Sequence, residues 1–247
     1  VQTAYQQISK ALTPSASSGY ARAGIYDPEP SATLMLNLEV PVDDLGMMYA
    51  FAAPEASVKN QALSRILARH LRVRAFETLR TEEQLGYAAG GGALDLYQHP
   101  MVIFYIQKPV KGPQDMLDRF NAYTLEYRDE LMGLSEESFG KFKAGVLTAL
   151  TEPPKNLSSE AGPFASDWAI ERYDFDTRAN LISAVESATL DDVQTFYDST
   201  VFGESRSRIV IQLKGQRYGS EPFGTIDGST VVDDVDQFHR DMPRQSL

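Results

Sequence analysis

RTEEQLGY, at residues 80–87, joins a segment of helical pattern to a glycine-rich segment of strand pattern. Upstream of it, apolar residues recur at steps of three and four from Leu63 to Leu79, as one buried helix face requires. Ser57 offers a hydroxyl that can cap the first turn. We therefore expect a helix from about 57 to 84 and a strand over 87–96. Arg80 and Tyr87, at this junction, can both donate hydrogen bonds to a peptide carbonyl.

The remaining patterns indicate an α+β chain. Residues 31–40 alternate apolar and polar side chains as a half-buried strand does, and 101–108 and 207–214 are rich in strand-forming residues. Helices are expected over 114–131, 135–150, 158–172 and 189–200, and residues 41–56 are expected to be a loop with a short helix at 45–51. This order predicts a two-layer domain, with a mainly antiparallel sheet and helices on one face. We expect residues 1–30 to be a linker or remnant of a preceding domain, 31–218 the domain itself, and 219–247 an acidic, extended C-terminal tail.

Composition excludes several classes of function. The chain has 247 residues, a formal net charge of -11 and no cysteine. Its acidity argues against nucleic acid and anionic membrane surfaces as partners, because both attract basic proteins. No stretch approaches the roughly 18 apolar residues that a membrane span needs. The first residue is valine and no charged-then-apolar leader follows it, so we expect an excised or processed segment.

Motifs for self-sufficient hydrolysis are absent from the sequence. His70 is followed by Leu-Arg-Val-Arg, which fits neither His-Glu-x-x-His nor its inverse, His-x-x-Glu-His, so we expect a packed or half-exposed helix residue and no metal site. No Gly-x-Ser-x-Gly occurs. Gly90–Gly92 lack the Lys-Ser/Thr of a phosphate loop and predict a bulge or a close backbone approach. Glu82 and Glu83 are expected to be solvated. The chain alone is therefore predicted to be inactive.

The octet RTEEQLGY, preceded by His70-Leu71 and Phe76, resembles the signature in the C-terminal half of the pitrilysin/insulysin (insulin-degrading enzyme) family of zinc endopeptidases. The resemblance runs from about Ser31 to the end of the chain. Further matching segments are FYIQ at 104–107, KGP at 111–113, LSEESF at 134–139, PPKNL at 153–157, the Trp168 to Asp176 element and the tail at 235–243.

That resemblance implies a mitochondrial-processing-peptidase-like metallohydrolase fold, used four times in two halves that enclose a peptide-sized chamber. This chain is similar to the fourth domain, whereas the zinc of the full-length enzyme lies on the first. By the same resemblance, Arg80 would bind a substrate backbone carbonyl. Tyr87 would hydrogen-bond the scissile carbonyl as it gains negative charge. The implied partners are a peptide substrate and the zinc-bearing N-terminal half of the same protein, the chain itself holds no cofactor, and the compartment is the periplasm.

A second hypothesis stays open at this point. The chain could be a non-catalytic scaffold or assembly domain of the same fold, as in the inactive subunits of related processing complexes. Arg80 would then pair with a nearby carboxylate, and Tyr87 would be buried with its hydroxyl bonded internally. An exposed Tyr87 hydroxyl beside Arg80 would favour the substrate-binding hypothesis instead.

Overall fold

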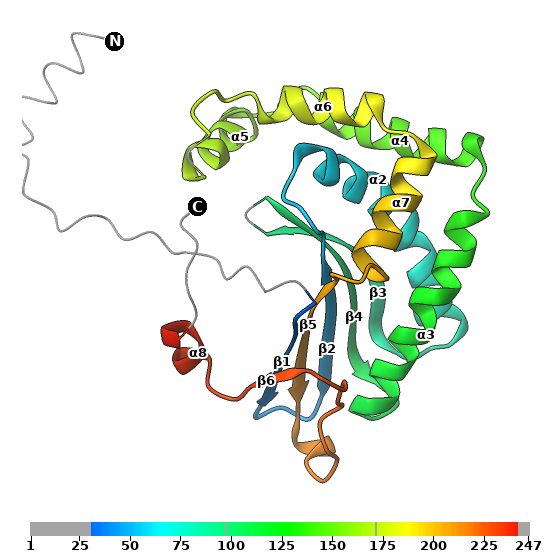
Figure 1. Cartoon of the computed structure of the whole chain (residues 1–247), viewed down its shortest axis with the longest axis vertical. Helices are drawn as coiled ribbons and strands as arrows, with labels where there is room; N and C mark the ends of the chain where they lie inside the picture. The colour runs from blue at the N-terminus through cyan, green and yellow to red at the C-terminus, as the bar shows by residue number, and fades with distance from the viewer. Residues whose placement is uncertain (1–30, 97, 171, 242–247) are drawn as a thin grey trace, which may run out of the picture. The chain divides into compact units, whose positions relative to one another are not determined.

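A computed structural model describes residues 31–96, 98–170 and 172–241 of the chain (Figure 1). The predicted linker or remnant at 1–30 lies outside these residues. The strands are β1 (Thr33–Glu39), β2 (Leu45–Ala52), β3 (Gly86–Leu96), β4 (His99–Pro109), β5 (Ser207–Lys214) and β6 (Thr230–Val232). The helices are α2 (Val58–Ala75), the π-helix η1 (Phe76–Glu82), α3 (Pro113–Met132), α4 (Glu136–Thr151), α5 (Leu157–Ala169), α6 (Thr177–Ser187), α7 (Leu190–Val201), the 3-10 turn η2 (Gln216–Tyr218) and α8 (Val235–Asp241).

One six-stranded sheet carries the fold, in the order β3-β4-β2-β5-β1-β6. The pairings of β2 with β4, of β2 with β5 and of β3 with β4 are antiparallel. Strand β1 runs parallel to both β5 and β6. Figure 1 shows helices α2, α3 and α7 gathered on one face of the sheet. The predicted α+β class, with a mainly antiparallel sheet and helices on one face, is confirmed.

Strand β2 corrects the prediction of a loop with a short helix at 45–51. The segment is LGMMYAFA, a nearly continuous apolar run that lies between β4 and β5 inside the sheet. Such a run lacks the alternation of a half-buried strand, because neighbouring strands and layers cover most of its side chains. Periodicity by itself does not separate a buried strand from a buried helix turn.

The core lies between the sheet and the helical layer. Phe104 of β4 is fully buried, and its ring centroid lies 6.1 Å from that of Phe120 on α3. Tyr197 of α7 is also fully buried and donates its hydroxyl to the carbonyl of Thr124 on α3 at 2.9 Å. Each large apolar side chain buried in this way stabilises the fold by about 1.5–3 kcal/mol. The three helices are thereby fixed on the sheet that ends at β3.

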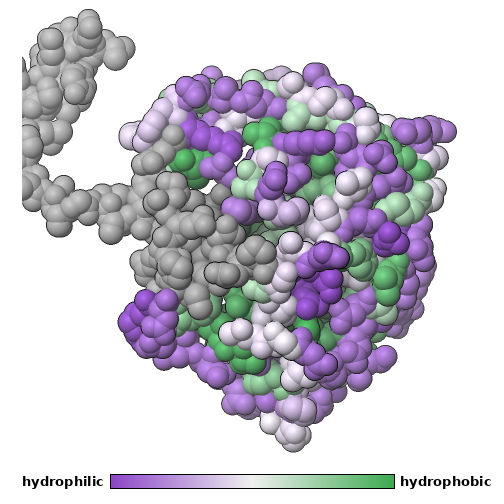
Figure 2. All heavy atoms as spheres, viewed as in Figure 1, coloured by the Kyte–Doolittle hydropathy of each residue, from purple (hydrophilic) through white to green (hydrophobic). Residues whose placement is uncertain are grey.

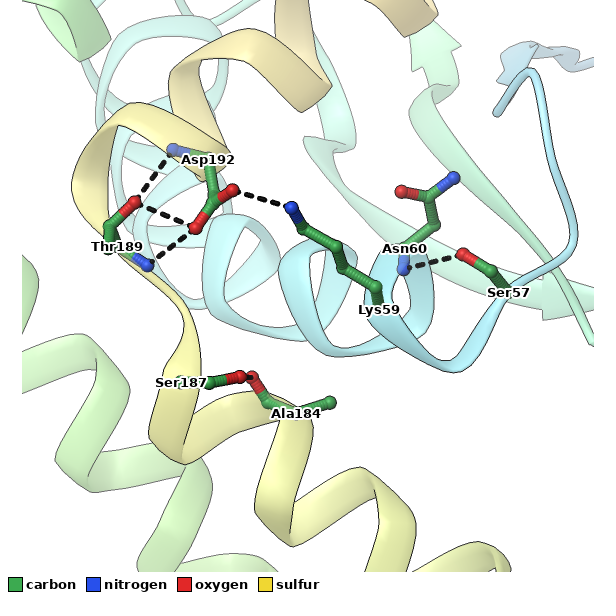
Figure 3. Close-up of polar contacts among 7 residues, drawn as sticks. All are labelled: Ser57, Lys59, Asn60, Ala184, Ser187, Thr189 and Asp192. Carbon is green, nitrogen blue, oxygen red and sulfur yellow. Dashed lines mark hydrogen bonds and ion pairs between the residues drawn. The ribbon is translucent and has the colours of Figure 1, made fainter.

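Capping interactions fix where α2 begins, as Figure 3 shows. The hydroxyl of Ser57 accepts the Asn60 N–H at 3.1 Å, as the sequence predicted. At the start of α7, Thr189 and Asp192 form a reciprocal capping box. Lys59 Nζ then lies 2.7 Å from Asp192 Oδ1, so an ion pair joins the first turns of α2 and α7.

The tail at 219–247 is not extended throughout its described part, which corrects that prediction. Its segment β6 pairs with β1 as the last strand of the sheet, and α8 follows. Gln212 of β5 holds the chain before β6 by two hydrogen bonds of 2.9 Å, one to the Gly224 carbonyl and one from the Gly224 N–H. No described helix combines the length and apolarity needed to cross a membrane. Figure 2 shows hydrophilic residues over much of the visible face, with hydrophobic residues between them.

Candidate functional site at the helix–strand junction

The helix that leads to Arg80 changes its winding before it ends. Regular α-helix stops at Ala75, and residues 76–82 continue as the π-helix η1. Gln84 then takes a left-handed backbone conformation with φ of 52°, and β3 begins two residues later. Leu79 is fully buried, and its carbonyl accepts the Leu85 N–H at 3.1 Å. A π-helical turn is rare and is frequent at functional sites; here it carries Arg80 into the turn before Tyr87.

The structure brings Arg80 and Tyr87 together. Arg80 Nε donates a hydrogen bond of 2.7 Å to the backbone carbonyl of Tyr87. The Tyr87 residue is 72% exposed, and its hydroxyl has no hydrogen bond to any described residue. Within the same part of the chain, Arg80 makes no ion pair, so its terminal N–H groups remain available. Neither the carboxylate partner nor the buried tyrosine expected of a purely structural pair is found among the described residues.

A second arginine, which the sequence did not point to, anchors the junction. Arg119 of α3 donates to both oxygens of Glu83, at 2.8 Å from Nε and 2.5 Å from Nη2. The side chain of Arg119 is only 17% exposed, and the hydrogen bonds that it donates to Glu83 raise its pKa further above its ordinary value. Glu83 is therefore held rather than solvated, which corrects its predicted role. The two residues are 36 positions apart, so no local sequence pattern predicts their pairing.

Gly86 is required by the close approach of β4. A Cβ built on it would lie 2.8 Å from the Gln107 carbonyl oxygen and 3.1 Å from that of Lys108. Any side chain would have to displace backbone atoms, so the glycine of the octet sets the path of the chain into Tyr87. Among the three glycines at 90–92, Gly91 leaves room for the Leu71 and Ala75 side chains of α2. The close backbone approach predicted for these glycines is therefore not found; the nearest atoms at Gly90, Gly91 and Gly92 belong to side chains.

His70 is a packed core residue, as predicted. It is buried, and its Nδ1 lies 3.0 Å from the hydroxyl of Tyr127. Burial lowers the pKa of His70, and the carboxylate of Glu130 opposes that shift only in part. Among the described residues, no group of three or more histidine, aspartate or glutamate side chains is placed to hold a metal ion. The site therefore offers hydrogen-bond donors at an exposed junction.

Comparisons with known proteins agree with the resemblance carried by the octet. The family model described as "PQQ synthase PqqF-like, C-terminal lobe domain 4" matches residues 66–165. Protease 3 of Escherichia coli (strain K12) is 24% identical over 187 residues, covering 76% of this chain and 19% of that protein. The A-factor-processing enzyme of Saccharomyces cerevisiae is 27% identical over 155 residues, covering 63% of this chain and 15% of that protein. The chain thus spans about a fifth or less of these relatives.

Solved structures share the fold. The crystal structure of pitrilysin superposes with a TM-score of 0.86 at 21% identity, covering 99% of this chain and 26% of that one. A structure described as the peptidase M16 inactive domain from Pseudomonas fluorescens gives a TM-score of 0.61 at 13% identity, covering 94% of this chain and 53% of that one. The pitrilysin match confirms the type of fold that the sequence resemblance implied.

Proposed function

We propose that this chain, a C-terminal domain of the pitrilysin family of peptidases, binds peptide substrates for a zinc site carried by another segment of the same protein. In this proposal Arg80 binds a substrate backbone carbonyl, and Tyr87 hydrogen-bonds the scissile carbonyl. The observation that carries the proposal is the exposed Tyr87, whose hydroxyl has no partner among the described residues and whose backbone carbonyl binds the Arg80 guanidinium. The Tyr87 hydroxyl and the terminal N–H groups of Arg80 can therefore donate hydrogen bonds to a substrate without breaking contacts that hold the fold.

The chemistry expected of the pair is electrostatic. When a peptide bond is attacked, its carbonyl oxygen gains negative charge, and a donor placed there stabilises the transition state more than the ground state. One such donor typically lowers the activation barrier by about 2.7–4 kcal/mol. The terminal N–H groups of Arg80 can bind a second carbonyl of the same peptide. Fixing two carbonyls of one chain would orient the bond to be cleaved.

The metal has to come from elsewhere in the protein. The sequence carries neither zinc motif, and the described histidine of α2 is buried against Tyr127. We propose that zinc is held by the N-terminal half of the full-length protein, where it would activate water and polarise the substrate. By the same resemblance we propose the periplasm as the compartment.

The experiment combines this chain with the zinc-bearing N-terminal half that the proposal assigns to the full-length protein. The pair should cleave peptides, and neither half alone should do so. Changing Tyr87→Phe removes only the hydroxyl, so kcat should fall by about 100-fold to 1000-fold with little change in KM. Tyr173→Phe is the matched control, because Tyr173 is also exposed, at 58%, and lies outside the octet. Chelator-resistant cleavage by the isolated chain, or an unchanged kcat for Tyr87→Phe, would refute the proposal.

The alternative is a non-catalytic scaffold domain of the same fold. The similarity in fold to a structure described as an inactive domain favours it. The exposure of Tyr87 favours the substrate-binding role, because its hydroxyl can reach a bound peptide, which a buried and internally bonded hydroxyl could not do. In the same experiment, a scaffold would support cleavage equally well with tyrosine or phenylalanine at position 87.

A further inference from the structure

A second candidate site lies at the far end of β3. A pocket of about 310 Å³ opens between α2, α4 and the end of β3. Its charged walls are Arg65, Arg69 and Arg72 of α2, against a single carboxylate, Asp95 of β3. The other side chains around it are small or apolar, apart from one serine. Three arginines spaced four and three positions apart share one helix face, so their charges converge on this pocket.

Two of these arginines have no anionic partner among the described residues. Arg65 forms an ion pair with Asp95 at 2.9 Å. Arg69 and Arg72 have no hydrogen bond or ion pair with any residue that the structure describes. Each instead lies against a glycine: a Cβ at Gly145 would be 3.2 Å from Arg69 Nη1, and a Cβ at Gly92 would be 3.2 Å from Arg72 Nε. In a chain with a net charge of -11, two guanidinium groups thus lie beside glycine backbone without an ion pair to any described residue.

The backbone beside this pocket is an open strand edge. Strand β3 is the first in the sheet order, so one of its sides has no strand partner in the described sheet. The carbonyl of Pro100 in β4 accepts the Ala53 N–H at 2.9 Å, so the backbone of Pro100 points toward β2. Its partner across the ladder, Asp95, must then direct its N–H and C=O away from β4, and so must Ala93. The Tyr87 carbonyl, which binds Arg80 rather than β4, obeys the same alternation.

We propose that this pocket binds a carboxylate of an extended peptide lying along the edge of β3. Arg69 and Arg72 would donate to the carboxylate, and the outward N–H and C=O of Ala93 would pair with the peptide backbone. Asp95 Oδ1 is buried without a partner among the described residues, and it can accept an N–H from a peptide. These groups together match a peptide better than a phosphate.

The spacing along β3 places the carboxylate relative to the reacting bond. Tyr87 and Ala93 are six positions apart, which corresponds to roughly 20 Å of extended chain. A peptide whose scissile bond lies at Tyr87 would therefore carry its acidic group about six residues away. This placement rests on the proposed function, whereas binding of the acidic peptide to the pocket does not require it.

The test measures binding by fluorescence anisotropy, using the 247-residue chain and labelled twelve-residue peptides. A peptide with one internal glutamate should bind at least about tenfold more tightly than its glutamine counterpart. Peptides with free and amidated C-termini show whether a terminal carboxylate binds as well. Arg69→Gln combined with Arg72→Gln should abolish the preference, and added salt should weaken it. Lys111→Gln with Lys141→Gln removes two exposed positive charges outside the pocket and should preserve the preference.

Two results would overturn the inference: an equal loss in the lysine control, or displacement of the peptide by inorganic phosphate but not by chloride of equal ionic strength. Circular dichroism should show unchanged folding, because both arginines are exposed. The two proposals fail separately. If Tyr87→Phe leaves turnover unchanged while the acidic preference holds, only the proposed function falls. If Tyr87→Phe slows turnover while the double arginine variant still prefers glutamate, only the carboxylate pocket falls.

Discussion

Replacing Arg119 with methionine tests whether the anchor on Glu83 positions the candidate site. Methionine keeps an unbranched apolar stem beside Tyr123, over whose ring the guanidinium now lies at 5.6 Å from the centroid. The substitution removes both hydrogen bonds to Glu83 and those to Glu126. Glu83 is the C-cap of η1 and lies between Arg80 and Tyr87, so releasing it loosens the turn that holds both donors.

The expected cost follows from burial of the partners. Removing a hydrogen-bonded charge costs about 1.5–3 kcal/mol, and the two bonds to Glu83 count as one because they reach one carboxylate. Glu126 is 54% exposed, so its ion pair adds only about 0–1 kcal/mol. We expect the free energy of unfolding to fall by about 2–3 kcal/mol, which lowers Tm by roughly 4–12 °C in a chain of this size. Under the proposed function, a displacement of the donors by about 1 Å would also slow peptide cleavage by the two halves together, by up to about 100-fold.

Urea unfolding and peptide cleavage measure the two effects. Arg128→Met is the matched control, because Arg128 lies on the same helix and binds both oxygens of Asp198 at 2.7 and 2.8 Å. The Arg128–Asp198 pair is more exposed than the Arg119–Glu83 pair, so its loss should lower the free energy of unfolding by less. It also lies far from the octet in sequence, so its loss should leave the rate of peptide cleavage unchanged. A double-mutant cycle with Glu83→Gln should give a coupling above about 0.5 kcal/mol. The reasoning fails if the coupling is absent, or if both arginine variants behave alike.

Three further predictions concern the scaffold. Gly140→Ala should stabilise α4 by about 0.5–1 kcal/mol in urea unfolding, since a Cβ there meets nothing within 4 Å. Hydrogen bonds from Lys59 and Thr189 lower the pKa of Asp192 to about 2, so the stability that this carboxylate contributes should be lost as pH falls from about 4 to 2. Asp192→Asn should lower the free energy of unfolding by about 1 kcal/mol at pH 7 and make it depend less on pH in this range. Burial lowers the pKa of His70, so the unfolded state binds the proton at a higher pH than the folded state does. The midpoint of urea unfolding should therefore fall as pH drops below about 6.5, and His70→Gln should reduce this fall.

Local sequence determined the elements whose signals lie within one turn or one strand. Strand β5 occupies the predicted residues 207–214, and α3 and α7 begin within a residue of their predicted starts. The hydroxyl of Ser57 caps α2 as expected, because an N-cap contacts only the next three residues. The octet at 80–87 likewise identified the family resemblance and the two candidate donors, since its residue types are readable without any long-range contact.

Tertiary structure decided what depends on distant partners. Residues 45–52 became a strand because β4 and β5 flank them, and 230–232 became one because β1 offers a free edge. Arg119 reaches Glu83 across 36 positions, and a pocket forms where α4 crosses the arginines of α2. Periodicity reports which face of a segment is apolar, whereas packing chooses the neighbour that covers it. For that reason the sequence named Arg80 and Tyr87, but only the folded chain placed the guanidinium of one on the carbonyl of the other.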